Sequence, residues 1–180
     1  MFVNSMFTIM DTIAQRLETA DRLNEILRRV GFALWQIQEL ESVAAQYFVL
    51  LSQAQKGMGL QAGNILIEEA QKKTFGATIR RLAQSGLLTP GIERGLNDLL
   101  AERNWLVHKS RANSRSAPYN DVAARKLFGR LDRIAEQALA LLKEIGELTE
   151  CFAKKHGTTE EYIKETSKRL LDEWRYADAT

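Results

Sequence analysis

The sequence predicts an all-α protein, a bundle of long amphipathic helices with short helical additions at both ends. Two observations lead to this fold class. Apolar residues recur every three or four positions over long stretches, whereas the alternation typical of a half-buried β-strand is absent from the 180 residues. The chain also has just two prolines, so little interrupts the helical patterns.

The longest apolar pattern lies in the second half of the chain. Its steps alternate between four and three residues without a break, which is the heptad seam of a helix that packs lengthwise on another helix. We therefore expect one long helix through this region. The pattern consists of Leu127, Leu131, Ile134, Ala138, Leu141, Ile145, Leu148 and Phe152.

A second long pattern precedes it and contains one exception, Glu41. A carboxylate on an apolar stripe most often sits at the edge of the stripe with its head in water. The alternative is that Glu41 is the acidic partner of a buried base or arginine. The apolar members of the pattern are Leu23, Leu27, Val30, Leu34, Ile37, Ala44, Phe48 and Leu51.

The region between these two patterns is less regular. Gly57, Gly59 and Gly63 mark a loop, and one or two shorter helices are expected to follow it and end near Gly86. Thr89-Pro90 reads as an N-cap followed by a first-turn proline. The second proline, Pro118, marks a second break in the helical pattern. A helix of about residues 90–112 is therefore predicted between the two prolines.

The two ends of the chain are expected to be additions to a bundle of residues 20–156. Residues 1–19 form a predicted helical extension with apolar positions at helical spacing. Residues 157–180 form a last helix, for which Thr158 and Glu161 resemble a capping box. The N-terminal apolar positions are Phe2, Met6, Ile9, Ile13 and Leu17, and those of the last helix are Ile163, Leu170 and Trp174.

Composition limits the possible classes of protein. Hydrophobic residues make up 45% and charged residues 27%, and the net charge of +2 does not by itself mark a nucleic-acid binder. The single cysteine, Cys151, excludes an internal disulfide and is expected in the core or at its boundary. No stretch approaches the ~18 consecutive apolar residues of a membrane span. We expect a cytoplasmic protein without a membrane partner, and neither a metal nor a cofactor, because two scattered histidines and one cysteine make no metal-binding cluster.

Arg103 occupies an unusual position within the stretch "AERNWLVHKS". When residues 94–112 are wound at roughly 100° per residue, Arg103 falls at the centre of an apolar stripe. An unpaired arginine in a dry core is costly, so it must meet a partner, a phosphate or a cleft. One interpretation is a structural arginine that snorkels or pairs with Glu41. The apolar neighbours on the stripe are Leu96, Leu99, Leu100, Leu106 and Val107.

A second, polar stripe runs beside the first and contains Asn97, Asn104, His108 and Arg111. Asn104 and His108 lie one turn apart and can be in contact, so one interpretation of His108 is an edge histidine that is hydrogen-bonded to Asn104. The opposite side of the helix is expected to be solvated, with Asp98, Glu102 and Lys109 on it.

A basic run without acidic residues follows the helix and contains Lys109, Arg111 and Arg115. Such a run is compatible with an ordinary solvated loop. It is equally compatible with a rim that gathers the phosphates of RNA, because cations close to a nucleic-acid backbone release its counterions.

The run from Arg103 through Asn104 to His108 resembles the Arg-Asn-three-residues-His motif of HEPN domains, which are helical nucleotide-binding and ribonuclease proteins. The resemblance covers about residues 20–150: a long helix, the "TFGATIRRL" segment, "LNDLLAERNWLVHKS" and another long helix. It implies a HEPN-like bundle. It matches Arg103 and His108 to the catalytic pair of the family and Asn104 to the polar companion.

The function that this resemblance implies is a metal-independent endoribonuclease of toxin or phage-defence type. Such an enzyme cleaves RNA by attack of the 2′-hydroxyl at a composite site in a homodimer. Since one histidine cannot act as base and acid at once, two copies can divide these roles.

The resemblance also leaves alternatives. Some toxins of the family carry a tyrosine that a nucleotidyltransferase antitoxin modifies, and Ser110 occupies that position here. The antitoxin, if there is one, is therefore a nucleotidyltransferase or another protein. Because many members are not catalytic, the second hypothesis is a HEPN-like nucleotide-binding or interaction module in a toxin–antitoxin or defence complex.

Overall fold

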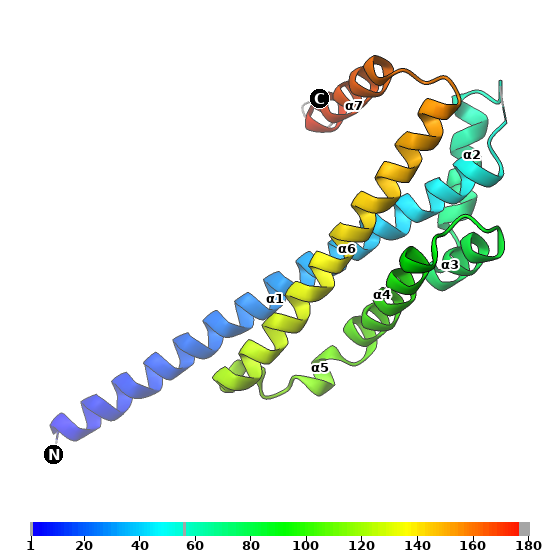
Figure 1. Ribbon diagram of the computed structural model, residues 1–180. Coiled ribbons are helices and arrows are strands. Elements are labelled where there is room, and N and C mark those ends of the chain that lie inside the picture. Colours follow the sequence, from blue (N-terminus) through cyan, green and yellow to red (C-terminus); the bar gives the residue numbers. More distant parts are fainter. Residues whose placement is uncertain (1, 56, 177–180) are drawn as a thin grey trace.

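The computed structural model describes residues 2–55 and 57–176, with side chains from residue 12 onward, and within these residues all regular structure is helical. The predicted all-α fold class is thereby confirmed. Its elements, labelled in Figure 1, are α1 (Phe2–Ser52), α2 (Leu60–Gln71), α3 (Phe75–Gln84), α4 (Pro90–His108), α5 (Ser110–Asn113), the 3₁₀ turn η1 (Ala117–Tyr119), α6 (Asp121–Lys155) and α7 (Glu160–Tyr176).

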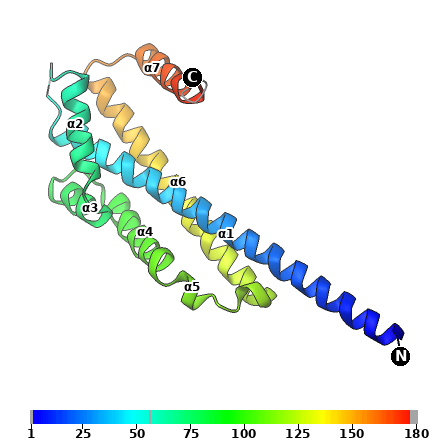
Figure 2. The ribbon, with the colours of Figure 1, turned by 180° about the vertical axis from the view of Figure 1, so that it is seen from behind.

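Two long helices, α1 and α6, form the spine of the fold and lie parallel along each other (Figures 1 and 2). The heptad seam predicted for α6 packs into this contact. Leu131, Ile134, Ala138 and Ile145 are almost completely buried, and toward the end of the helix Leu148 and Phe152 are only partly covered. The seam therefore determines how the two longest helices pack together.

The pattern predicted for α1 is correct in its second half and wrong at its start. Leu23 and Leu27 are 44% and 60% exposed, and the buried stripe is centred instead on Ala33, Ile37 and Leu40. The physical reason is that α1 has apolar residues on more than one side. Among the predicted residues, the bundle covers Val30, Leu34, Ile37, Ala44, Phe48 and Leu51 wholly or partly.

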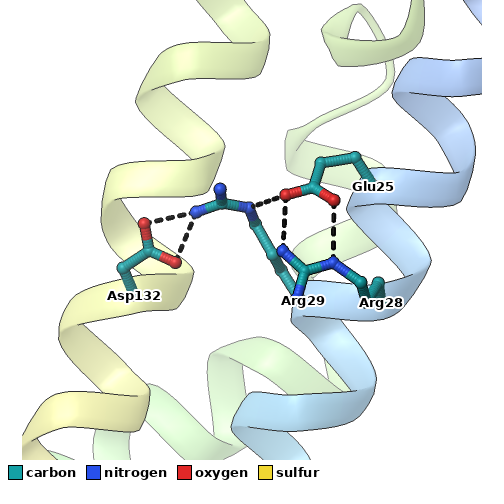
Figure 3. A network of polar contacts seen from close by, with 4 residues as sticks. All are labelled: Glu25, Arg28, Arg29 and Asp132. Carbon is teal, nitrogen blue, oxygen red and sulfur yellow. Dashed lines mark hydrogen bonds and ion pairs between the residues drawn. The ribbon is translucent and has the colours of Figure 1, made fainter.

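A network of ion pairs joins α1 to α6 next to the buried stripe (Figure 3). Arg29 Nε donates to Glu25 Oε1 at 2.5 Å, and the same guanidinium pairs with Asp132 on α6. Arg28 donates twice to the Glu25 carboxylate, at 2.8 Å each. Because these hydrogen bonds favour its ionised form, the pKa of Glu25 is lowered to about 2, the bond from Arg28 contributing most and that from Arg29 next.

The region after α1 folds into two short helices, as the sequence indicated. Thr74 separates α2 from α3 by capping α3, accepting a hydrogen bond from Ala77 N at 3.3 Å. Gly86 ends this part in the left-handed region, with φ +66°. Tyr47 on α1 donates from its hydroxyl to the Leu87 carbonyl at 3.1 Å and holds the end of the segment against the spine.

Helix α4 begins as predicted but ends early. Thr89 caps it by accepting from Ile92 N at 3.3 Å, and Pro90 is its first residue. The helix stops at His108 rather than at about residue 112, because Lys109 leaves the helical region with φ −127°. The following residues form the separate short helix α5. The interpretation of residues 90–112 as one helix was therefore too long.

A glycine, Gly95, lies where α4 packs closely on α6. A Cβ on Gly95 would lie 2.9 Å from Leu141 Cδ2, which is shorter than an ordinary contact between carbon atoms. A hydrogen bond also joins the two helices at this point, because Gln137 Nε2 of α6 donates to the Gly95 carbonyl at 3.1 Å. Helix α4 is thus held directly against α6, with its C-terminal half directed along the spine (Figure 1).

The ends of the chain make few contacts with the bundle. The first part of α1 projects beyond the other helices (Figures 1 and 2), and Ile13 and Leu17 are more than half exposed. The side chains of Phe2, Met6 and Ile9 lie outside the described residues. Helix α1 is continuous through residues 19 and 20, whereas Gly157, with φ +91°, separates α6 from α7.

Two smaller expectations about the C-terminal part need correction, those for the cap of α7 and for Cys151. Thr159 rather than Thr158 caps α7, accepting from Tyr162 N at 3.2 Å. No residue of α7 is buried, and Leu170 and Trp174 are exposed. Cys151 is exposed rather than part of the core or its boundary. Among the described residues, no helix is both long and apolar enough to cross a bilayer.

Candidate functional site

Arg103 lies where α4 crosses α1 and makes an ion pair there. Its Nε donates to Glu41 Oε1 at 3.1 Å, and the two side chains are 33% and 26% exposed. The apolar stripe around Arg103 is real, since Leu96, Leu99 and Leu106 are buried. This arrangement explains how an arginine can occupy the centre of an apolar stripe: a carboxylate from the neighbouring helix neutralises it.

The pair also decides between the two interpretations of Glu41. Its carboxylate is the acidic partner of an arginine and not simply a solvated group at the edge of a stripe. Within the described chain, Arg103 makes this single polar contact, through Nε. Its two terminal nitrogens therefore remain available to a further acceptor.

Asn104 and His108 are both exposed and belong to the polar side of α4. No hydrogen bond joins them in the described structure, so the interpretation of His108 as an edge histidine bonded to Asn104 is not supported. Val107, predicted on the apolar stripe, is 48% exposed, because α3 covers the first half of α4 and does not reach this turn. The C-terminal turns of α4 thus present an amide, an imidazole and an uncovered apolar side chain.

The other side of α4 contains an ion pair that sequence reasoning missed. Glu102, expected in solvent, is half-buried and accepts two hydrogen bonds from Arg130 of α6, at 2.8 and 3.1 Å. The Arg130 guanidinium also stacks 3.5 Å from the ring centroid of Trp105. Trp105 Nε1 is buried and makes no hydrogen bond within the described chain. No local signal could reveal this cluster, since Arg130 lies 25 residues from Trp105 and 28 from Glu102 in the sequence.

The segment that follows the basic run is held on the spine at Pro118 and Asp121. Arg22 of α1 donates from Nη1 to the Pro118 carbonyl at 3.3 Å and pairs with Asp121 at 2.6 Å. Ala117 is completely buried beside this anchor. Lys109, Arg111 and Arg115 are exposed, and within the described residues none of them makes an ion pair. Three unneutralised cations therefore follow directly on His108.

A polar hollow of about 280 Å³ adjoins the Arg103–Glu41 pair. Glu41 belongs to its wall, together with Gln38 and Ser42 of α1, and its far side comes from the end of α2 and the start of α3. Sequence reasoning did not anticipate it, because it forms only where three helices meet. Its remaining lining residues are Ala45, Ala70, Gln71, Lys73, Phe75 and Thr78.

A single chain does not direct Arg103 and His108 at one point. Five residues of α-helix separate them by about 140° around the axis and about 7.5 Å along it. Arg103 is directed at α1, whereas His108 is exposed at the last residue of α4. A reacting phosphate that is to meet both groups therefore needs a second surface to complete the site.

The second half of α4 and the segment after it thus carry an arginine, an amide, an imidazole and three cations that make no ion pair among the described residues. Comparison of the chain with protein-family models, with curated protein sequences and with solved structures finds no match.

Proposed function

We propose that the chain is the subunit of a metal-independent endoribonuclease of toxin or phage-defence type that acts as a homodimer. The observation that carries the proposal is the state of Arg103: Glu41 holds it through Nε alone, its side chain is 33% exposed, and its terminal nitrogens make no polar contact within the described residues. A guanidinium held in this way can present two donors to a phosphate.

The chemistry follows from these three side chains. RNA supplies its own nucleophile, the 2′-hydroxyl, and a neutral His108 imidazole can accept its proton while an imidazolium from a second copy protonates the leaving 5′-oxygen. Acid–base help of this kind is typically worth ~10²–10⁴-fold. Arg103 stabilises the extra negative charge on the phosphorane, and Asn104 orients the phosphate or the imidazole. Lys109, Arg111 and Arg115 bind neighbouring phosphates.

The experiment compares the wild type with His108→Ala on end-labelled RNA in the presence of EDTA. The wild type should cleave and leave a 2′,3′-cyclic phosphate or the 3′-phosphate derived from it, identified by mass spectrometry, while His108→Ala loses cleavage. DNA should remain intact because it lacks the 2′-hydroxyl. The matched control is His156→Ala, which removes an exposed histidine whose Nδ1 lies 2.9 Å from the Phe152 carbonyl oxygen.

Two outcomes would contradict this mechanism. Cleavage that disappears in EDTA, or that leaves a free 3′-hydroxyl, would indicate a metal-dependent nuclease. Equal cleavage by the wild type and His108→Ala would show that the His108 imidazole takes no part in the reaction.

A second candidate function is a non-catalytic nucleotide-binding or interaction module of a toxin–antitoxin or defence complex. One observation favours it: the Glu41 pair is by itself a sufficient structural reason for an arginine on the buried stripe. A wild type that binds RNA without cleaving it, with binding weakened by changes to the basic run, would support this candidate over the first.

A further inference from the structure

The hollow beside the Arg103–Glu41 pair combines a buried inner wall with a polar rim. Its volume is about 280 Å³, close to the lower limit of pockets that hold small ligands. The rim is reached from solvent, because three of its polar residues are exposed and two are half-buried. The inner wall consists of Ala45, Ala70, Phe75 and Thr78. The rim consists of Gln38, Gln71 and Lys73, which are exposed, and of Glu41 and Ser42, which are half-buried.

The hollow exists because small side chains line it where α1, α2 and α3 meet. Ser42, Ala45 and Ala70 leave space that larger residues would fill. A hydrogen bond from Gln71 Nε2 to Ser42 Oγ, 2.9 Å long, joins α2 to α1 beside this space. Contacts within the chain thus hold the walls in place, so a ligand does not have to order them when it binds.

Three polar groups of the rim have unused hydrogen-bonding capacity. Glu41 accepts from Arg103 through Oε1, and its Oε2 makes no hydrogen bond within the described chain. The Gln38 amide makes none there either, and Lys73 makes no ion pair among the described residues. The hollow therefore offers a carboxylate that only accepts, an ammonium group that only donates and an amide that does both.

Glu41 connects the hollow with the candidate site, because the same carboxylate lines the hollow and holds Arg103. On the proposed function, Arg103 binds the scissile phosphate. A group that contacts Glu41 from inside the hollow then lies next to that phosphate, and in RNA the flat, polar group next to each phosphate is a base. The inference rests on the proposed function for this choice of ligand, whereas the hollow itself belongs to the fold.

The donors and acceptors of the rim favour one of the four bases. Guanine presents two neighbouring N–H donors, at N1 and at the 2-amino group, beside the O6 acceptor, so its edge can pair with a carboxylate and a lysine. Adenine and cytosine present one amino group beside an acceptor nitrogen, and uracil presents one N–H between two carbonyls. Each of these three bases would set an acceptor against the carboxylate and leave it unpaired.

We propose that the hollow between α1, α2 and α3 is a base-recognition pocket that selects guanine beside the scissile phosphate. Glu41 accepts from the N1–H and the 2-amino group, and Lys73 donates to O6. Gln38 covers the base at the open side of the hollow. Glu41 thereby has two tasks, since it holds Arg103 through one oxygen and reads the base through the carboxylate edge that faces the hollow.

The first experiment measures binding without cleavage. Fluorescence anisotropy gives the dissociation constants of the wild type for single-stranded thymidine octamers with one central guanine, hypoxanthine or adenine. These DNA probes lack the 2′-hydroxyl and stay intact under the proposed mechanism. Guanine should bind about tenfold more tightly than adenine, which is the effect of one good bidentate contact. Hypoxanthine lacks the 2-amino group and should lie between them. Equal binding of guanine and adenine would overturn the inference.

Two lysine variants test the rim of the hollow. Lys73→Ala removes the donor to O6 and should reduce the preference for guanine over adenine to about threefold or less. The matched control is Lys72→Ala, which removes the same charge at the neighbouring exposed position, outside the hollow. It should weaken both probes equally and keep the preference. The readout is a ratio between two bases, so a general loss of affinity does not affect it. The same preference in both variants would overturn the role of Lys73.

Glu41→Gln tests the carboxylate. The glutamine amide places a donor beside an acceptor, which is the arrangement that pairs with adenine. The preference should therefore reverse, so that the adenine probe binds at least as tightly as the guanine probe. The melting temperature, measured in parallel, shows whether the variant is folded at the assay temperature. A folded Glu41→Gln that keeps the full preference for guanine would contradict the proposal.

The last experiment maps the cut sites in RNA of mixed sequence. Sequencing of the fragment ends should place guanine at one fixed position beside most of the cut bonds, and Lys73→Ala should weaken this preference. Guanine-dependent binding without cleavage would contradict the ribonuclease and leave the base pocket standing. Cleavage without a base preference would do the reverse. A chain that neither cuts RNA nor distinguishes the probes would contradict both.

Discussion

Arg103 of α4 and Glu41 of α1 form an ion pair, with 3.1 Å between Nε and Oε1, across 62 residues of sequence. The pair places a guanidinium at the crossing of two helices, where only part of its surface is covered. A partly exposed pair of this kind contributes about 1 kcal/mol or less to stability. Its larger consequence is that Arg103 is held through Nε alone, so its terminal nitrogens make no polar contact within the described residues.

Arg103→Lys should reduce RNA cleavage by about 10²-fold or more while the melting temperature changes little. Lysine retains the charge but lacks the planar fork that binds two phosphate oxygens. Glu41→Gln removes the same ion pair but keeps the guanidinium, so it should retain most of the activity. Cleavage rate and melting temperature are measured together for both variants. Wild-type activity in Arg103→Lys would exclude a phosphate-binding role.

Arg130→Lys serves as the matched control for that substitution. Arg130 makes an ion pair with Glu102 of similar exposure, and it stacks on Trp105. Its replacement should lower the free energy of unfolding by about 1 kcal/mol, through loss of stacking and of a bidentate pair, and should leave cleavage unchanged. If both arginine variants lose activity in proportion to their stability, the effect of Arg103 is structural.

Simultaneous replacement of Lys109, Arg111 and Arg115 by alanine should weaken RNA binding and its dependence on salt. Each phosphate contact that is lost reduces the slope of log K against log salt by about 0.7 for a single strand. Binding is measured by fluorescence anisotropy at several salt concentrations. Alanine at Lys143, Lys155 and Lys168, which are exposed on α6 and α7, is the control and should not change the slope. If the salt slope does not change in the first variant, the basic run does not contact phosphates and is an ordinary solvated loop.

Acid should weaken the contact between α1 and α6 through Glu25. Its pKa is about 2 in the folded protein, so between roughly pH 4.5 and pH 2 the unfolded chain binds more protons than the folded one, and stability falls as the pH is lowered. Above this window the contribution of the ion pairs is fully present. Glu25→Gln should therefore melt lower than the wild type at pH 6, and the difference should shrink toward pH 2. A difference that does not depend on pH would contradict the assignment.

Leu131→Ala should lower the free energy of unfolding by about 2–5 kcal/mol, because Leu131 is 1% exposed within the α1–α6 contact and its truncation leaves a cavity. Leu139→Ala, on the same helix but 54% exposed, is the matched control and should cost less than about 1 kcal/mol. Chemical denaturation of both variants measures the difference. Equal effects would mean that the seam does not lie where the heptad pattern places it.

The features that the sequence determined by itself are those with local causes. A heptad that continues from Leu127 to Ile145 specifies a helix and its buried side without reference to the rest of the chain. The cap at Thr89 is likewise local, since its hydroxyl accepts from an amide three residues away. The position of Arg103 at the centre of an apolar stripe was also predictable, because it follows from helical periodicity alone.

The tertiary structure alone decided which partner each of these surfaces meets. Glu41 and Arg103, like Glu102 and Arg130, are brought together by helix crossings, and no spacing within one helix encodes such a contact. The same holds for α1, whose periodicity shows apolar residues on two sides. Only the packing of α6 determined that Ala33 and Ile37 are buried while Leu27 and Trp35 remain free. The physical reason is that periodicity specifies the directions of side chains around one axis, whereas burial depends on the second body that covers them.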